Sequence, residues 1–315
     1  MYLAANISNP FVAPWLAFLE IQAGAWVRRG AFHPLTVDAV RTTNLATFGA
    51  DLLIGSVVTG LTLALLAGWT IYLLGRDTDR SPFTELSRLA SDRYIDGGLM
   101  VWEFVRRKLR GDPVYKASIC DGLLPPGRTL VDVGCGLGMT LALLAEVRRA
   151  KAAGTWPADW PPPPCFERMV GVETRARVAM LAAGALADDA EVITADARAA
   201  TPLRAHVVLM FDVLHMMRRG EQESLLAAMV ASLEPGGLIL IREADASAGW
   251  RFTAVRWGNR LKALAFGSWR QQFHFRSVSE WQECLSRHGL QTEVRDMSAG
   301  TPFANVLLRV TPRQP

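Results

Sequence analysis

The sequence of 315 residues lacks the spacings that hold metal ions or disulfides. Its four cysteines, Cys120, Cys135, Cys165 and Cys284, form no CxxC pair, and its five histidines form no HExxH or other paired spacing. No metal site is therefore predicted, and reduced, unpaired thiols are expected. A GxSxG motif is also missing, which argues against a hydrolase of the type that carries its serine on a nucleophile elbow.

The chain also has little excess charge of either sign. Lys and Arg number 34 against 30 Asp and Glu, giving a net charge of +4, and the basic residues form no long run. We therefore predict no nucleic-acid partner, whereas scattered arginines suit contact with anionic lipid. The length allows one membrane segment and one domain of about 200 residues with its own core.

Residues 130 to 138, Leu-Val-Asp-Val-Gly-Cys-Gly-Leu-Gly, are the most informative segment that is present. An apolar run breaks into three glycines, and a helical pattern follows from Met139. Strand, glycine turn and helix in this order are typical of a nucleotide-cofactor site, because glycine lets the backbone approach a ligand and a helix N-terminus offers free N–H groups. The spacing is GxGxG, whereas a dinucleotide site reads GxGxxG.

An acid also lies two residues before the first glycine. With it, the segment resembles motif I of the class I S-adenosylmethionine-dependent methyltransferases, (D/E)xGxGxG. The resemblance implies that S-adenosylmethionine is the cofactor, and that Cys135 acts through its backbone. The cofactor-binding residues expected in this segment are Asp132, Gly134, Cys135, Gly136 and Gly138.

Two later acids appear in the order of the same family. One apolar run ends at Glu173, beside Thr174, and another leads to Asp196 and Ala197. The resemblance implies that Glu173 accepts the ribose hydroxyls and that Asp196 takes the adenine amino group. Each acid alone could instead cap a following helix. Residues 153–165, rich in proline, are interpreted as a loop inserted after the first helix.

Two further elements complete the pattern. Residues 206–212 form a nearly continuous apolar run that ends in Phe211 and Asp212 and leads to His215. The D-x-L-H sequence resembles motif IV of small-molecule methyltransferases, and residues 233–243 resemble the L-x-P-G-G strand of the same family. Phe211 and Asp212 are accordingly predicted to contact the cofactor.

The fold class follows from this order of elements. We predict an α/β domain over residues 121–315 with a Rossmann-like, seven-stranded, mostly parallel sheet, and the resemblance covers about residues 121–311. A helix over 278–288 precedes two strands, 291–295 and 304–310, which have no helix between them. They predict a C-terminal antiparallel hairpin at the sheet edge.

The first 90 residues are expected to anchor the chain in a membrane. Residues 52–74 contain no charge and no proline, and as a helix they would reach about 34 Å, enough for a ~30 Å hydrocarbon core. Trp69 and Tyr72 lie near one end, where aromatics favour the interface. The alternative is a buried helix of a soluble domain, although such a helix normally has a polar face.

The basic residues around this span predict its orientation. Four arginines follow it within 20 residues, whereas Arg41 alone precedes it, so the C-terminal side is expected in the cytoplasm. We predict a single-pass protein of the inner, cytoplasmic membrane with a cytoplasmic catalytic domain. Residues 11–27 carry Pro14, Glu20 and Gln22, and are expected to lie on the membrane rather than cross it.

Two features of this region suggest contacts. Small residues recur every fourth position and could pack against another helix, or the row could be accidental; they are Ser56, Gly60, Ala64 and Gly68. Residues 91–120 are expected to link the anchor to the domain and to include a cap helix. The residues expected on one side of that helix are Leu99, Trp102, Phe104 and Val105.

His215 is the candidate catalytic residue. It lies one helical turn past Asp212, near the expected methyl group, and imidazole titrates near neutrality. It could act as a general base, orient the substrate, or simply pack locally.

Seven aromatic residues between the fifth strand and the last helix could line a pocket for a lipophilic or aromatic substrate. They could equally form a helix core or lie on the bilayer surface. They are Trp250, Phe252, Trp257, Phe266, Trp269, Phe273 and Phe275.

The leading hypothesis is a membrane-anchored methyltransferase acting on a lipophilic or aromatic small molecule, such as a quinone, pigment or lipid precursor. Two alternatives remain open. One is an NAD(P)-dependent oxidoreductase on a Rossmann fold, and the other is a non-catalytic membrane scaffold that retains the fold.

Overall fold

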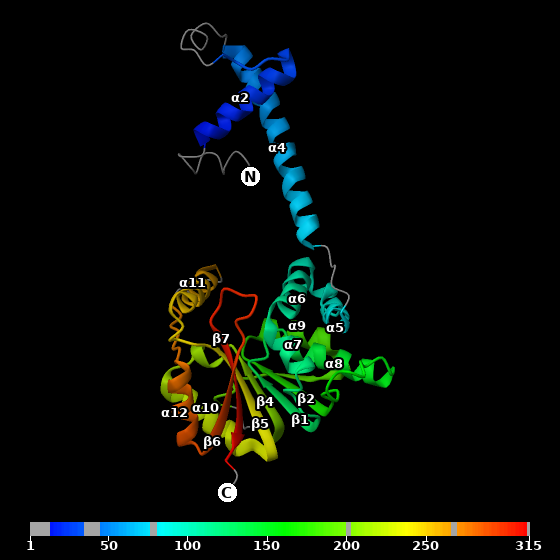
Figure 1. Cartoon of the computed structure of the whole chain (residues 1–315), viewed down its shortest axis with the longest axis vertical. Helices are drawn as coiled ribbons and strands as arrows, with labels where there is room; N and C mark the ends of the chain where they lie inside the picture. Colours follow the sequence, from blue (N-terminus) through cyan, green and yellow to red (C-terminus); the bar gives the residue numbers. More distant parts are fainter. Residues whose placement is uncertain (1–12, 35–44, 76–80, 200–202, 266–269, 314–315) are drawn as a thin grey trace. The chain divides into compact units, whose positions relative to one another are not determined.

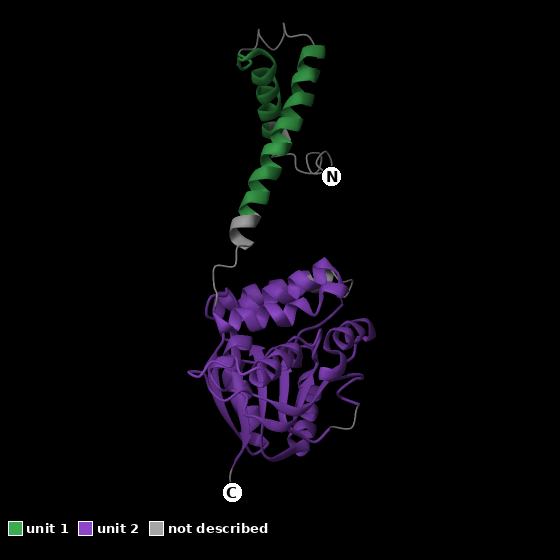
Figure 2. Ribbon diagram, turned by 90° about the vertical axis from the view of Figure 1, so that its right-hand side faces the viewer, with its two compact units in different colours: residues 1–78 green, residues 79–315 purple. Residues whose placement is uncertain are grey.

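The computed structural model describes residues 13–34, 45–75, 81–199, 203–265 and 270–313 (Figure 1). The chain divides into two compact units, residues 1–78 and residues 79–315 (Figure 2).

Unit 1 contains two closely packed helices, α2 (Ala13–Arg29) and α4 (Leu45–Gly75). Two glycines allow the close approach. A Cβ atom added to Gly24 would lie 1.8 Å from a backbone oxygen of α4, and one added to Gly55 would lie 1.6 Å from a backbone oxygen of α2. The helices therefore pack backbone to backbone, as small residues permit.

Buried polar groups join the same two helices. The carboxylate of Asp51 on α4 is fully buried and lies 2.7 Å from Arg28, 2.8 Å from Arg29 and 2.7 Å from His33. These partners compensate a charge that would otherwise be costly in an apolar helix pair.

Only part of the predicted row of small residues lies at the contact between α2 and α4. Ser56 donates a hydrogen bond of 2.9 Å to Glu20 of α2. Among the described residues, nothing lies within 4 Å of a Cβ atom added to Gly60 or Gly68. A packing role for the whole row, including Ala64, stays a prediction.

Helix α4 contains a stretch, Ala46–Thr70, that is long and apolar enough to cross a membrane. It begins six residues before the predicted span and includes Asp51, whose charge is paired with Arg28. Residues 61–70 are all exposed in unit 1.

Unit 2 is built on a seven-stranded sheet of order β3-β2-β1-β4-β5-β7-β6, and the predicted fold class is confirmed. Strands β1 to β5 are parallel, and β7 runs antiparallel to both β5 and β6. The strands are β1 (Gly127–Val133), β2 (Phe166–Glu173), β3 (Glu191–Thr194), β4 (Ala205–Phe211), β5 (Leu233–Ala244), β6 (Leu290–Asp296) and β7 (Asn305–Pro312).

Helices cover both faces of this sheet, as a parallel sheet requires. The α-helices of unit 2 are α5 (Pro82–Asp92), α6 (Leu99–Gly111), α7 (Pro113–Cys120), α8 (Met139–Ala152), α9 (Ala176–Leu186), α10 (Arg219–Ser232), α11 (Gly249–Ala265) and α12 (Val278–Arg287). Short 3-10 helices are η1 (Ile95–Gly97), η2 (Ala187–Asp189) and η3 (Leu214–Met216).

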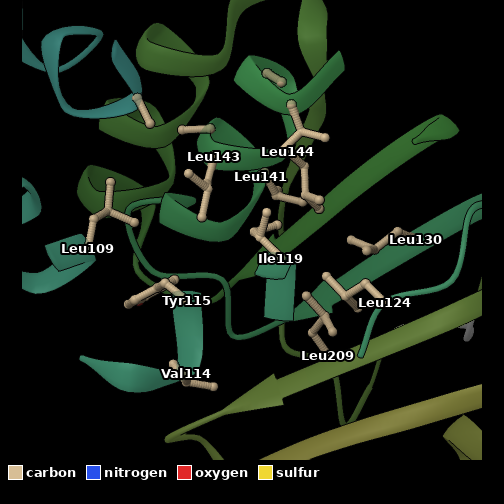
Figure 3. Close-up of a cluster of buried hydrophobic side chains, with 14 of the residues drawn as sticks. Leu109, Val114, Tyr115, Ile119, Leu124, Leu130, Leu141, Leu143, Leu144 and Leu209 are labelled. Atoms are coloured by element: carbon tan, nitrogen blue, oxygen red, sulfur yellow. The ribbon is translucent and has the colours of Figure 1, made fainter. Parts of the chain in front are cut away.

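Neighbouring residues of the central strands point into two different cores. Leu130 and Leu209 belong to the core beneath α6, α7 and α8, where Tyr115 and Leu141 are also buried (Figure 3). Val131, next to Leu130, belongs to the other core. Both cores hold the strand ends in place, and these ends form the candidate site described next.

Candidate active site

The carboxyl ends of β1, β2, β4 and β5 meet at one edge of the sheet, and the predicted cofactor residues lie there. Gly134, Gly136 and Gly138 follow β1 with φ angles of +70°, +58° and +73°, in the left-handed region that favours glycine. A turn of this shape brings the chain from the strand into α8.

The glycines are required for different reasons. A Cβ atom added to Gly134 would lie 2.5 Å from the side chain of Val213, and one added to Gly138 would lie 2.8 Å from Leu186. Nothing lies within 4 Å of a Cβ atom added to Gly136. Of the three glycines in this turn, Gly136 alone faces open space, and a cofactor could occupy that space.

The backbone of Cys135 is hydrogen-bonded to β2 within the turn. Its N–H donates to the carbonyl of Val172 at 3.1 Å. Its side chain points inward, because a Cβ atom added to Gly171 of β2 would lie 2.7 Å from the Cys135 sulfur.

Two buried carboxyl groups flank the turn, with opposite pKa shifts. Burial and the nearby charge of Glu173 raise the pKa of Asp132 to about 8. Burial would also raise the pKa of Glu173, but hydrogen bonds from Arg175 outweigh it and lower that pKa. Glu173 also accepts the N–H of Gly136 at 3.0 Å. The carboxylate of Glu173 therefore joins β2 to the glycine turn.

Exposed arginines are paired with Glu173 and Asp196, the two acids that the sequence predicts for the ribose and the adenine. Arg175 donates to Glu173 at 2.9 Å, and its side chain is 62% exposed. Arg198 donates to Asp196 at 2.6 Å and lowers the pKa of that carboxyl. Both arginines reach their acids from the surface, so a ligand could replace them. Thr174 is exposed, and Ala197 is half-buried.

An ion network that was not predicted from the sequence lies at the end of β4, with Arg242 and Asp112 buried and Asp212 partly exposed. Arg242 of β5 bonds with one guanidinium nitrogen to Asp212 and with the other to Asp112 at 2.6 Å. Asp212 follows the half-buried Phe211, and its φ of +59° is unusual for a residue with a side chain. Burial would raise the pKa of Asp212, but the charges of Arg242 and Lys108 outweigh it and lower that pKa.

His215 belongs to a buried pair with a second residue that the sequence did not predict, Glu243. Its Nδ1 lies 2.7 Å from Glu243 Oε2, and its backbone N–H donates to Oε1 of the same carboxylate at 3.2 Å. Burial would lower the pKa of His215, but the charge and hydrogen bond of Glu243, with the charge of Asp212, outweigh it and raise that pKa. Because Nδ1 faces Glu243, the other ring nitrogen, Nε2, is directed away from the carboxylate.

The predicted aromatic residues divide into two groups. Phe275 stacks on the His215 ring with centroids 4.7 Å apart, Phe273 lies 5.9 Å from that ring, and Phe252 meets Phe275 edge-on at 5.2 Å. Trp250 and Trp257 are instead exposed on α11. The remaining two, Phe266 and Trp269, lie outside the described residues.

A glycine turn and the acids Asp132 and Glu173 lie at the carboxyl edge of a parallel sheet. This arrangement defines an enzyme of the Rossmann-like class. A family model described as a methyltransferase domain matches residues 101–293. The chain belongs to this methyltransferase family and is an S-adenosylmethionine-dependent methyltransferase. A second family model, of an uncharacterized protein conserved in bacteria (DUF2062), matches residues 1–81.

Solved structures of low identity resemble the chain. The magnesium protoporphyrin IX methyltransferase of Synechocystis, with bound SAH, is 14% identical, with 78% of this chain and 95% of that chain covered and a TM-score of 0.43. An O-methyltransferase family 2 protein of Planctomyces limnophilus, in complex with apigenin, is 18% identical, with 95% and 80% covered and a TM-score of 0.47. The N-methyltransferase NodS of Bradyrhizobium japonicum, with SAH, is 15% identical, with 74% and 98% covered and a TM-score of 0.46. No match was found among curated proteins.

Proposed function

We propose that this enzyme transfers a methyl group to a hydroxyl oxygen of an aromatic or otherwise lipophilic small molecule at the cytoplasmic face of a membrane. The observation that carries the proposal is the buried pair of His215, shortly after β4, and Glu243 of β5, with the His215 ring stacked against Phe275. A base held in this way is needed when the methyl acceptor must lose a proton.

The residues of the glycine turn are the ones that would hold S-adenosylmethionine, which supplies the methyl group on its sulfonium. Gly136 leaves room for the ligand. Glu173 would lose its hydrogen bond from Arg175 and accept hydrogen bonds from the ribose hydroxyls instead. Asp196 would exchange Arg198 for the adenine amino group. Asp132 contributes a buried carboxyl beneath the turn.

His215 would remove the proton of the acceptor hydroxyl through Nε2. Glu243 keeps a proton on Nδ1 and stabilises the imidazolium that forms, since its carboxylate is 1% exposed and its charge is not screened by water. General-base catalysis of this kind contributes about 10²–10⁴-fold to a rate. Phe273 and Phe275 lie against the imidazole and Phe252 packs on Phe275, and this aromatic cluster suits an aromatic acceptor.

The apolar helix supports the membrane location. Ala46–Thr70 has the length and composition of a span, and the arginines that follow it favour a cytoplasmic C-terminal side. A lipophilic acceptor partitions into the bilayer, so an anchored enzyme would work where its substrate is concentrated.

The test starts with calorimetry of S-adenosylhomocysteine and of NAD on the purified full chain. Binding of S-adenosylhomocysteine and not of NAD is expected, and a chain that does not bind S-adenosylhomocysteine would contradict the cofactor site proposed at the glycine turn. Metabolite profiling of a deletion strain should then reveal a compound lighter by one methylene. With that compound in hand, His215→Gln should lower kcat and spare cofactor affinity. A normal kcat would overturn the role of His215.

A further inference from the structure

We propose that the end of unit 2 formed by α6 and α11 docks on an anionic lipid surface. This inference rests on the proposed membrane function and names the partner of the catalytic unit itself. The docking face is defined by Leu99, Met100 and Phe104 on α6 and by Trp250, Trp257 and Leu261 on α11.

Helix α6 exposes its most apolar residues. Leu99 is 73% exposed, Met100 84% and Phe104 49%, whereas Val105 and Leu109 on the other side are fully buried. The expectation that Leu99 and Phe104 lie on the same side of the helix as Val105 was wrong. The helix is therefore apolar on two sides, and only one of them belongs to the core.

Helix α11 repeats this arrangement. Trp250, Trp257 and Leu261 recur at helical spacing and are 69%, 65% and 61% exposed, while Val255 and Ala263 are buried toward the domain. Exposed tryptophans on one helix face are typical of a surface that enters the interfacial region of a bilayer.

Both helices lie at the edge of the sheet that carries the candidate site (Figure 1). Asp112, directly after α6, bonds to Arg242 near the end of β5, and α11 begins shortly after that strand. Arg251 of α11 donates to Ser298 between β6 and β7 at 2.9 Å. The exposed apolar residues and His215 therefore belong to the same end of unit 2.

The charges next to the docking face favour anionic lipid as the occupant. Helix α11 has four basic residues and no acid, and α6 has four basic residues and one acid, Glu103, which is paired with Arg106 and Arg107. Arg107, Arg256 and Arg260 are exposed beside the apolar residues. Basic residues interleaved with tryptophan and leucine match phosphate headgroups above acyl chains.

The covalent connection keeps such a surface within reach. Only residues 76–80 and the Ser81 cap separate α4 from α5, the first helix of unit 2. Six residues span at most about 20 Å when fully extended. If α4 crosses the bilayer, docking would let a lipophilic acceptor enter the site directly from the lipid.

The experiment places an environment-sensitive fluorophore on the full chain in vesicles of phosphatidylcholine and phosphatidylglycerol. Labels go on Met100→Cys and Trp257→Cys. The control is Glu167→Cys, whose side chain is 74% exposed at the start of β2, on the opposite edge of the sheet. The unsubstituted chain, labelled in parallel, corrects for the four native cysteines. Doxyl-labelled lipid should quench the labels at 100 and 257 and spare the label at 167.

Charge supplies a second readout. Each arginine near an anionic surface contributes about fivefold to the docking equilibrium, so Arg256→Gln with Arg260→Gln should reduce quenching at 257. Replacing phosphatidylglycerol by phosphatidylcholine should do the same.

Quenching at 100 and 257 no stronger than at 167 would overturn the proposal. So would shielding of these labels in detergent without lipid, which would indicate a second copy or another protein on this face. A chain that does not stay with the vesicles would contradict the predicted membrane anchor but not the docking face. Vesicles with doxyl-labelled lipid would then be added to the labelled chain, and quenching at 100 and 257 would decide whether the face binds lipid.

Discussion

The substitution Glu243→Gln is the sharpest test of the proposed proton chemistry. It keeps the shape of the side chain and an oxygen that can accept from Nδ1 of His215, but it removes the charge. A hydrogen bond to a charged group is worth about 1.5–3 kcal/mol, against about 0.5–1.5 kcal/mol for a neutral one. The loss of about 1–2 kcal/mol from the imidazolium that forms in the transition state should lower kcat by about 5–30-fold.

The pH dependence has a defined sign. His215 accepts a proton only when neutral, so kcat should rise with pH through its pKa, which Glu243 and Asp212 raise above the ordinary value despite burial. Glu243→Gln removes the largest influence that raises this pKa. The rising limb of the kcat profile should therefore move to lower pH while the plateau falls. The melting temperature should fall more at acidic pH, because protonated His215 loses its charged partner.

The chain provides a matched control in a second histidine–glutamate pair. His206 lies 3.9 Å from Glu234, both are partly exposed, and the pair is at the opposite edge of the sheet. Glu234→Gln should leave kcat and its pH profile unchanged. An unshifted rising limb and a normal kcat in Glu243→Gln would refute the assignment of His215 as the base.

Three other perturbations have distinct expected results. Gly136→Val should abolish S-adenosylhomocysteine binding in calorimetry, because the side chain would occupy the open space beside the turn. Gly134→Val should instead lower the melting temperature, because its Cβ would lie 2.5 Å from Val213. Arg242→Met removes one of the two cationic partners of the buried Asp112 and leaves Lys108 at 2.5 Å, so it should cost less in urea unfolding than the about 3–5 kcal/mol of a fully unpaired buried charge. The full chain should pellet with membranes and resist high salt and carbonate; release would show that Ala46–Thr70 is peripheral or buried.

The fold was predictable because its signals are local and ordered. Apolar runs, the glycine turn and the acids after successive strands predict a parallel sheet, and parallel strands bring their carboxyl ends to one edge. The position of Asp132, Glu173 and His215 at that edge could therefore be predicted without information on long-range contacts. The same order predicts the hairpin of β6 and β7.

The partners of these residues were not predictable in the same way. Arg242 and Glu243 end the apolar run of β5, and two charges there were a signal that the strand reaches a polar site. Nothing local, however, pairs Glu243 with a histidine 28 residues earlier, or Arg242 with Asp112, 130 residues earlier. The reason why each position of the turn requires glycine also depends on residues distant in sequence, such as Val213.

The protonation of Asp132 leads to a last prediction, which concerns cofactor binding and not methyl transfer. Burial and Glu173 raise the pKa of Asp132 to about 8, so its carboxyl holds a proton at neutral pH in the free enzyme. A cationic sulfonium cofactor bound above the turn favours the carboxylate and lowers that pKa. Binding of S-adenosylmethionine at pH 7 should therefore release a proton, and affinity should rise with pH up to about 8.

Calorimetry in buffers of different ionisation enthalpy measures this release directly. Asp132→Asn should abolish the dependence on buffer. It should also raise the melting temperature of the free enzyme increasingly from about pH 4 to about pH 8, the window in which the unfolded acid is ionised and the native acid still holds its proton. Glu173 is already ionised in the free enzyme, because Arg175 lowers its pKa, so Glu173→Gln should weaken binding. It should reduce the released proton without abolishing it, because the charge that helps to raise the pKa of Asp132 is lost but burial remains. A binding enthalpy independent of buffer in the unsubstituted enzyme would contradict this reasoning, because an acid protonated before binding and ionised afterwards must give its proton to the buffer.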